Sequence, residues 1–271
     1  MKRGSIIAAI AVVSLPCAAF SQSHQLKGRI VLTSLPAPSA PHHVTKANRA
    51  CGAQLPNEAL VYGKKLELEN AVVFLANIKP EQLPPSAVAM EIANCLYKPR
   101  VSVVLQGDTL VLRSLDATFH HARGYLREFT LGWDRLATKE IFSAKPKEVF
   151  NFIFRAKGNT AWEALNTPGL IEVRSETGED WLKAVVFVMP HRFFAISNAK
   201  GEFAFEGLPA GKYDIALWHE TLGLKRQLVE VSANQKNELL VSWEINKPAR
   251  ADSLSQAPTT TTPDSSARTQ K

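Results

Sequence analysis

Alternation of apolar and polar side chains over residues 201–223 constrains the fold of this chain more than any other feature. Phe203 and Phe205 alternate with alanine and glutamate, and a second run from Tyr213 to Leu217 alternates in the same way. A period of two places the large side chains on one face, as in a half-buried β-strand. The Gly-Leu-Pro-Ala-Gly sequence between the runs lets the chain reverse, since glycine permits positive φ and proline fixes φ. The stretch therefore predicts two strands joined in a β-hairpin.

Short strand-like segments with turn signals between them occur along most of the chain, with almost no helical periodicity. Residues 71–75 form a continuous apolar run of strand length, which predicts a central strand of a sheet. Gly107 and Asp108 separate two extended runs and indicate a second hairpin. Well over ten such strands predict an all-β protein made of sandwiches. The chain length favours two domains, which we place at residues 22–183 and 184–246.

The two ends of the chain differ in composition from the middle. Basic residues 2 and 3 precede an apolar run over residues 6–19, and Ala19 and Ser21 flank Phe20, so residues 1–21 are predicted to be a secretory signal peptide. No later apolar run approaches the ~20 residues of a membrane helix. We expect a periplasmic or secreted protein without a membrane span. Residues 247–271 are rich in Thr, Ser and Pro and lack aromatics, which predicts a disordered tail.

The net charge and the cysteine content indicate which partners and which crosslinks to expect. The formal net charge of +7 is modest and the basic residues are dispersed, which argues against a nucleic-acid partner. Cys51 and Cys95 are the cysteines that remain after the predicted cleavage, and an even count in an oxidising compartment favours one disulfide over two free thiols.

Catalytic motifs are absent from the sequence. There is no G-x-S-x-G, no Walker A loop and no dinucleotide-binding glycine pattern. The pair His219-Glu220 could begin a zinc-protease motif, but the position four residues after His219 is Gly223. We therefore expect a protein that is not an enzyme and that carries no cofactor.

The pattern G-x-F-x-F-x-x-L-P-x-G-x-Y at residues 201–213 resembles carboxypeptidase-regulatory-like (prealbumin-like) β-sandwich modules, over about residues 184–243. Modules of that kind are structural or adhesive, and starch-binding-like sandwiches are similar to them. This resemblance implies a possible glycan partner. The candidate sugar-stacking side chains are Trp181 and Trp218.

A second resemblance covers most of residues 27–243. The segments that carry it are residues 95–101, 107–116, 150–151, 168–173 and 181–184. Together they resemble a periplasmic cupredoxin-like family, plastocyanin-type and methylamine-utilisation-like, in which a copper-binding sandwich precedes a regulatory-like module. The resemblance implies a cupredoxin-like sandwich followed by a prealbumin-like sandwich.

The copper ligands of that family are mostly replaced in this chain. Its first histidine, in a D-x-x-x-H-N context, corresponds to His120 after Asp116. Its C-x-x-H-x-W-M run, anchored on Trp181, places Glu179 at the histidine and Leu182 at the methionine. The cysteine position falls on Glu176, or on Ser175 if the spacing is counted from Val173. Blue copper requires a thiolate and two histidines. The sequence therefore predicts a sandwich that has lost its copper site.

Three functions remain open from the sequence. The preferred interpretation is a non-enzymatic exported binding or scaffold protein with an unidentified protein or glycan partner. The first alternative is carbohydrate binding through the C-terminal sandwich. The second is a non-blue metal site in which His120 joins Glu176 or Glu179, because nitrogen and carboxylate ligands suit Zn²⁺ or Cu²⁺.

Overall fold

The computed structural model describes residues 24–44, 50–76, 78–129, 141–233 and 235–245. Within these ranges the regular structure is β-strand, with no α-helix, so the predicted all-β class is confirmed. In this described part, no helix has the length and hydrophobicity needed to cross a bilayer. The predicted signal peptide and C-terminal tail lie outside the described residues.

Two sheets are built from strands near the beginning and the end of the chain. Sheet 1 has the order β15-β1-β18, with β15 (Glu202–Leu208), β1 (His24–Leu32) and β18 (Asn237–Trp243). Sheet 2 has the order β14-β4-β16-β17, with β14 (Phe194–Ile196), β4 (Val72–Leu75), β16 (Gly211–His219) and β17 (Gly223–Val231).

The other two large sheets are built from the middle of the chain. Sheet 3 has the order β10-β9-β12-β13-β7, with β10 (Lys147–Phe154), β9 (His120–Glu128), β12 (Gly169–Ser175), β13 (Lys183–Met189) and β7 (Val101–Leu105). Sheet 4 has the order β11-β8-β5-β6, with β11 (Thr160–Ala164), β8 (Thr109–Ser114), β5 (Ala87–Ala93) and β6 (Leu96–Lys98). A short ribbon pairs β2 (His42–His43) with β3 (Gln54–Leu55).

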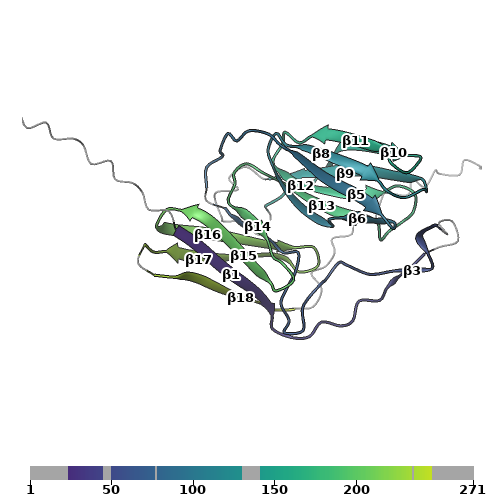
Figure 1. The fold of residues 1–271 in the computed structure, drawn as a ribbon. Helices are drawn as coiled ribbons and strands as arrows, with labels where there is room; N and C mark the ends of the chain where they lie inside the picture. Colours follow the sequence, from purple (N-terminus) through teal and green to yellow (C-terminus); the bar gives the residue numbers. More distant parts are fainter. Residues whose placement is uncertain (1–23, 45–49, 77, 130–140, 234, 246–271) are drawn as a thin grey trace, which may run out of the picture.

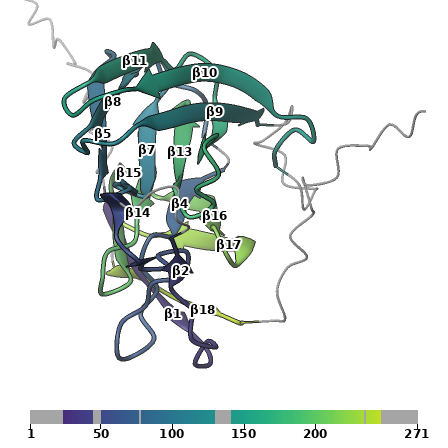
Figure 2. The ribbon, with the colours of Figure 1, turned by 90° about the vertical axis from the view of Figure 1, so that its right-hand side faces the viewer.

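Three apolar cores join these four sheets into one stack, with sheets 1, 2, 3 and 4 in that order (Figure 1 and Figure 2). One core fills the space between sheets 1 and 2, and another fills the space between sheets 3 and 4. The third core lies between the two inner sheets, where Phe74 of β4 meets Phe187 of β13. All four residues of β4 are buried, because an inner sheet is covered on both faces. The predicted central strand at residues 71–75 is thus present.

The middle of the chain is inserted into the sandwich formed by its ends. Sheets 1 and 2 form what we call the terminal sandwich, made of β1, β4 and β14–β18, and sheets 3 and 4 form the inserted sandwich, made of β5–β13. Strand β1 runs parallel to β18, from Leu26 opposite Asn237 to Leu32 opposite Trp243. The sheets therefore do not follow the contiguous ranges 22–183 and 184–246, since β1 and β4 belong with the C-terminal strands.

The predicted hairpin at residues 201–223 is wrong, because its two strands enter different sheets. Strand β15 pairs with β1, and β16 pairs with β17 and β4. The segment between them carries the chain from sheet 1 to sheet 2. Within it, the Tyr213 hydroxyl donates a hydrogen bond to the Pro209 carbonyl at 2.8 Å. On β1, Gly28 lies opposite Phe203, whose ring occupies the space that a Cβ at Gly28 would fill. That close cross-strand packing directs β15 to β1 rather than to β16.

The second predicted hairpin, at Gly107-Asp108, is also a crossing between sheets. Strand β7 pairs with β13 in sheet 3, whereas β8 pairs with β5 and β11 in sheet 4. The Asp108 carboxylate is buried and accepts hydrogen bonds from the backbone N–H groups of Ser86 (2.6 Å) and Leu105 (2.8 Å). These bonds fix the turn to a neighbouring loop, so the two strands separate.

A bidentate ion pair ties the two sandwiches together. Arg100, which precedes β7, contacts Glu220 in the β16–β17 turn through Nη2 at 2.6 Å and Nε at 2.8 Å. The arginine side chain is 9% exposed and the glutamate 25%. A bidentate arginine–carboxylate pair is stronger and more specific in geometry than a single charge-assisted hydrogen bond.

We expect Arg100→Met to lower the free energy of unfolding by about 2 kcal/mol, because it leaves the half-buried Glu220 carboxylate without its partner. Urea denaturation at neutral pH measures the loss. The double variant Arg100→Met with Glu220→Gln should recover part of it, since the orphaned charge is then removed. Equal losses in the single and double variants would contradict this assignment.

Two buried histidines of the terminal sandwich are predicted to make stability depend on pH. His191 Nε2 donates to the Leu75 carbonyl at 3.0 Å, and His219 Nδ1 accepts the Thr221 N–H at 3.2 Å. Burial lowers the pKa of each imidazole to about 4. As the pH falls from about 6.5 to 4, the unfolded chain binds protons that the folded protein does not, so stability decreases.

We expect a loss on the order of 3 kcal/mol per histidine across that window, with no further loss from these groups below pH 4. Urea midpoints measured at pH 7.5, 6 and 5 test the slope. A His191→Asn variant keeps a donor for Leu75 but cannot titrate, and its slope should be shallower than that of the parent protein. If the parent protein and His191→Asn show the same dependence of stability on pH, His191 does not contribute to that dependence.

Candidate functional site: a buried polar cluster at one end of the inserted sandwich

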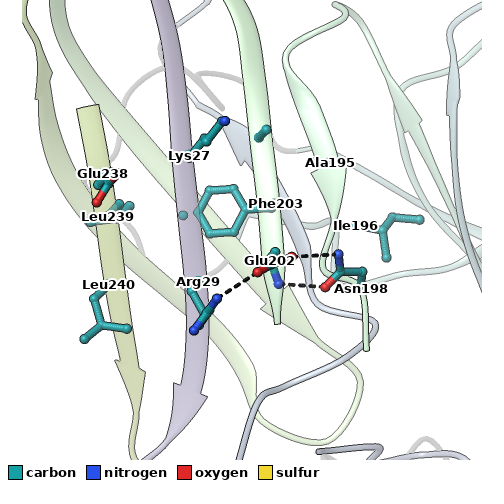
Figure 3. Close-up of a pocket in the computed structure, with 12 residues that line it drawn as sticks. Lys27, Arg29, Ala195, Ile196, Asn198, Glu202, Phe203, Glu238, Leu239 and Leu240 are labelled. Carbon is teal, nitrogen blue, oxygen red and sulfur yellow. Dashed lines mark hydrogen bonds and ion pairs between the residues drawn. The ribbon is translucent and has the colours of Figure 1, made fainter. Parts of the chain in front are cut away.

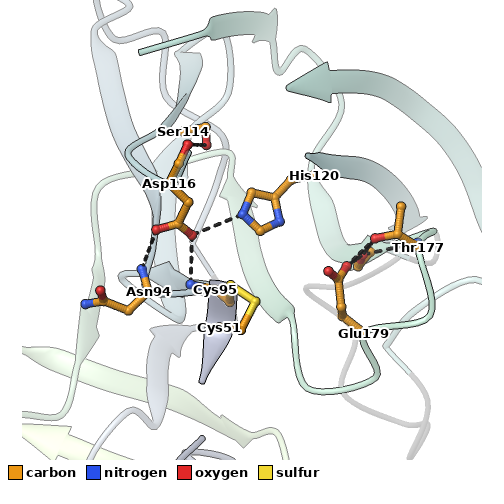
Figure 4. Close-up of polar contacts among 9 residues, drawn as sticks. Cys51, Asn94, Cys95, Ser114, Asp116, His120, Thr177 and Glu179 are labelled. Carbon is orange, nitrogen blue, oxygen red and sulfur yellow. Dashed lines mark hydrogen bonds and ion pairs between the residues drawn. A yellow bond between two sulfur atoms is a disulfide. The ribbon is translucent and has the colours of Figure 1, made fainter. Parts of the chain in front are cut away.

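Asp116 organises a tight turn at one end of the inserted sandwich. Its Oδ1 accepts the N–H of Asn94 at 2.7 Å, and its Oδ2 accepts the N–H of Cys95 at 2.8 Å (Figure 4). Both of these turn residues have positive φ, 53° and 58°, which the two hydrogen bonds help to hold. Cys95 is thereby placed against Cys51, with a Cα–Cα distance of 5.5 Å, and the predicted disulfide between them is confirmed.

His120 begins β9 and points into the same cluster. Its side chain is fully buried, and its Nε2 lies 3.0 Å from Asp116 Oδ2. A carboxylate can only accept, so Nε2 carries the proton and Nδ1 presents its lone pair. No described residue forms a hydrogen bond with that buried Nδ1. Asp116 therefore fixes the tautomer and the orientation of the ring, and Nδ1 lies on the side of the ring away from the carboxylate.

The two candidate glutamates separate in the structure. Glu179 is 5% exposed, and its Oε2 accepts hydrogen bonds from the hydroxyls of Ser175 and Thr177. Glu176 faces outward, where it accepts the Tyr125 hydroxyl at 2.9 Å. Figure 4 shows the His120 ring with Asp116 on one side and Glu179 on the other. Glu179 is therefore buried although it belongs to an acidic run at residues 176–180, and its carboxylate accepts hydrogen bonds from two hydroxyl groups of its own loop.

Two further buried polar atoms belong to this end of the sandwich. The Tyr97 hydroxyl and the Trp181 Nε1 have no hydrogen-bond partner among the described residues, although both side chains lie in the core between sheets 3 and 4. Burial, with a smaller contribution from the charge of Glu179, raises the pKa of Tyr97. An unpaired buried donor costs about 1–3 kcal/mol, so three such atoms at one end mark a region able to hold a polar guest. Tyr97 was missed from the sequence, where no motif distinguishes it from a core residue.

The ligating atoms that come closest together are not those expected from the sequence. Within the described residues, Cys95, Asp116 and His120 place one ligand atom each within 4.8 Å of the others. Glu176 and Glu179 are not part of that group. Because Cys95 is in a disulfide, the group presents no thiolate in this state.

The two candidate tryptophans are packed in apolar cores. Trp181 is 5% exposed, and its ring lies 6.5 Å from that of His42. Trp218 is partly buried in the core between sheets 2 and 3, with its ring centroid 5.1 Å from that of Phe187. The Trp181 ring is therefore not open for stacking on a sugar, and the Trp218 ring is only partly exposed. Among the described tryptophans, the exposed one is Trp162 on β11, which is 67% exposed and which the sequence does not distinguish.

A broad depression of about 890 Å³ lies over the terminal sandwich, at β1, β15 and β18 (Figure 3). Two of its charged residues, Arg29 and Glu202, form an ion pair with each other. Arg29 Nη2 lies 2.7 Å from Glu202 Oε1, and the Glu202 backbone N–H donates to Asn198 Oδ1 at 2.9 Å. None of the residues that line it contains a buried polar atom without a hydrogen-bond partner, whereas His120, Tyr97 and Trp181 each contain one, so the buried cluster is the stronger candidate site.

Comparisons with known proteins give distant similarities. No protein-family model matches the chain, and no curated protein sequence matches it significantly. Among solved structures, an amicyanin mutant in the Cu(I) form is similar at 16% identity, over 38% of this chain and 82% of amicyanin, with a TM-score of 0.27. A purple cupredoxin from Nitrosopumilus maritimus is similar at 14% identity, over 37% of this chain and 98% of its own, with a TM-score of 0.27. No functional conclusion rests on similarities of this size.

Proposed function

We propose that this chain is a non-enzymatic binding or scaffold protein of an exported compartment, built on a sandwich of copper-protein ancestry that no longer holds blue copper. The observation that carries the proposal is the Cys51–Cys95 disulfide, which uses the sulfur atoms of both described cysteines. Blue copper requires a free thiolate together with two histidines. At the positions that the resemblance assigns to the other ligands stand Glu176, Glu179 and Leu182.

The hydrogen bonds of the histidines support a role without catalysis. His120 is bonded to a carboxylate, His121 Nε2 lies 2.6 Å from the Asn151 amide oxygen, and His191 is bonded to backbone. In the described part of the chain, neither the His120 ring nor the His121 ring is hydrogen-bonded to a serine, threonine or cysteine side chain that it could activate as a nucleophile. The partner, a protein or a glycan, is not identified by this geometry.

The two alternatives are less well supported. Carbohydrate binding through Trp181 or Trp218 needs an open aromatic face, and both rings are packed against other side chains. A metal site shared by His120 with Glu176 or Glu179 is less well supported, because the three-residue ligand group that contains His120 is completed by Cys95 and Asp116. Calorimetric titration with Cu²⁺ and Zn²⁺ discriminates the second alternative, because His120→Asn should then abolish a binding event that the parent protein shows.

The metal content of the exported, oxidised protein tests the main proposal. Protein purified without chelators should contain no stoichiometric copper and should lack an intense visible band from a thiolate–copper bond. The free thiol content of the unfolded protein serves as a control and should be near zero, since both sulfurs are in the disulfide. Stoichiometric copper with that band would refute the proposal.

A further inference from the structure

The disulfide lies within the buried polar cluster and holds one of its potential metal ligands. One carboxylate oxygen of Asp116, one ring nitrogen of His120 and the Sγ of Cys95 lie within 4.8 Å of one another. The backbone N–H of Cys95 is bonded to the same Asp116 oxygen that contacts His120. Figure 4 shows the three side chains gathered around the end of the sandwich, with Cys51 beside Cys95.

We propose that reduction of the Cys51–Cys95 disulfide converts this cluster into a binding site for Zn²⁺ or a similar divalent transition metal, with Cys95, Asp116 and His120 as ligands. The proposed site concerns the reduced protein and is independent of the proposed function, which concerns the oxidised one. Thiolate, imidazole and carboxylate are the three ligand types that Zn²⁺ takes in proteins, and a water molecule can complete a tetrahedral set.

The unpaired Nδ1 of His120 leaves the ring able to change tautomer and to bind a metal through Nε2. His120 is fully buried, yet its Nδ1 has no hydrogen-bond partner among the described residues. The nitrogen that would bind the metal is Nε2, which lies 3.0 Å from Asp116 Oδ2, and the proton that Nε2 gives up can move to the unpaired Nδ1. The hydrogen bonds from Asn94 and Cys95 to Asp116 come from backbone N–H groups, which hold the carboxylate in place independently of the sulfur–sulfur bond.

The redox step requires a dithiol reductant and transfers two electrons. A thiolate of the reductant attacks the Sγ of Cys51, which is 7% exposed, whereas Cys95 is 1% exposed. The sulfur–sulfur bond breaks, and its electron pair leaves on Cys95 as a thiolate. The second thiol of the reductant then attacks the mixed disulfide, releases Cys51 as a thiolate that takes up a proton, and leaves the reductant as a disulfide. The Cys95 thiolate binds the metal without needing to lose a further proton.

A matched pair of variants separates the ligand from its disulfide partner. Cys51→Ser and Cys95→Ser both lack the disulfide, but only Cys51→Ser keeps the Cys95 thiol beside Asp116 and His120. The probe is Co²⁺, whose thiolate charge-transfer band and tetrahedral visible bands report on the ligand set, followed by competition with Zn²⁺. We expect Cys51→Ser to bind one Co²⁺ with these bands at least tenfold more tightly than Cys95→Ser. Adding His120→Asn to Cys51→Ser should weaken that binding at least tenfold.

The parent protein provides the second arm, which does not depend on the folding of the variants. It should show no thiolate–Co²⁺ band when oxidised and should gain one after reduction by a trialkylphosphine, with circular dichroism reporting whether the fold is kept. Equal Co²⁺ binding by the two serine variants, or the lack of a thiolate band in the reduced parent protein, would overturn the proposal. Neither result bears on the copper content of the oxidised protein, so the two proposals fail separately.

Discussion

Replacing Cys51 and Cys95 together by alanine is expected to lower the free energy of unfolding by about 4 kcal/mol. The two residues are 44 positions apart, so the disulfide closes a loop that contains β3, β4 and β5 and links the two sandwiches along the chain. In the chain-entropy account, the crosslink stabilises the protein by restricting the unfolded ensemble, and the effect grows with the length of the loop. Urea denaturation of the oxidised parent protein and the double variant measures the difference.

Chemical reduction of the parent protein is the matched control for this prediction. A phosphine-reduced sample should show nearly the same loss as the alanine variant, because both remove the same crosslink. A loss below about 1 kcal/mol in both samples would mean that the loop is held closed by other contacts in the unfolded chain, contrary to the chain-entropy account.

Phe187→Ala should cost about 4 kcal/mol, because Phe187 fills the core between the two sandwiches. The side chain is fully buried, and its ring centroid lies 5.1 Å from that of Trp218, 5.9 Å from Phe142 and 6.2 Å from Phe74. These neighbours come from both sandwiches, so the cavity should weaken the junction as well as sheet 3. We expect thermal and urea unfolding to become less cooperative, with the terminal and inserted sandwiches beginning to unfold separately.

Trp162→Ala is the control for the loss of a large aromatic side chain. Trp162 is 67% exposed on an edge strand, so its replacement should change stability by less than about 0.5 kcal/mol. If Phe187→Ala lowers the free energy of unfolding no more than Trp162→Ala does, the prediction is wrong. The core between sheets 2 and 3 would then contribute little to stability.

The sequence predicts the class of structure well but the strand partners poorly. Alternation of Phe203 and Phe205 defines which face of β15 is buried, and the burial pattern of that strand agrees with it. Alternation carries no information about the neighbouring strand, and the turn at Pro209 can join strands of one sheet or of two. The correct pairing depends on Gly28, far away in the chain, which accommodates the Phe203 ring.

The four-layer stack does leave a signal in the sequence. Strand β13 contains the unbroken apolar run Ala-Val-Val-Phe-Val-Met, and β4 contains Val-Val-Phe-Leu. Such runs are typical of strands covered on both faces. The insertion of one sandwich into the other could not be predicted in this way, because it depends on β1 pairing with β18 at the opposite end of the described chain.

The candidate site was predictable in part. His120 and the cysteine pair were identified from the sequence, and the structure brings them together around Asp116. The burial of Glu179 was not expected, because a run of acidic residues beside a glycine is usually exposed. Its hydroxyl donors, Ser175 and Thr177, lie in its own loop, and only the folded loop turns them toward the carboxylate. Tyr97 and Trp181 join the cluster through sheet packing, which no local motif encodes.

Titration of the oxidised protein with Cu²⁺, followed by visible absorption and electron paramagnetic resonance, tests the central claim most directly. We predict that copper either fails to bind stoichiometrically or binds with the weak bands of nitrogen and oxygen ligands, because neither Cys51 nor Cys95 offers a thiolate. One equivalent of tightly bound copper with an intense visible thiolate band would contradict the claim.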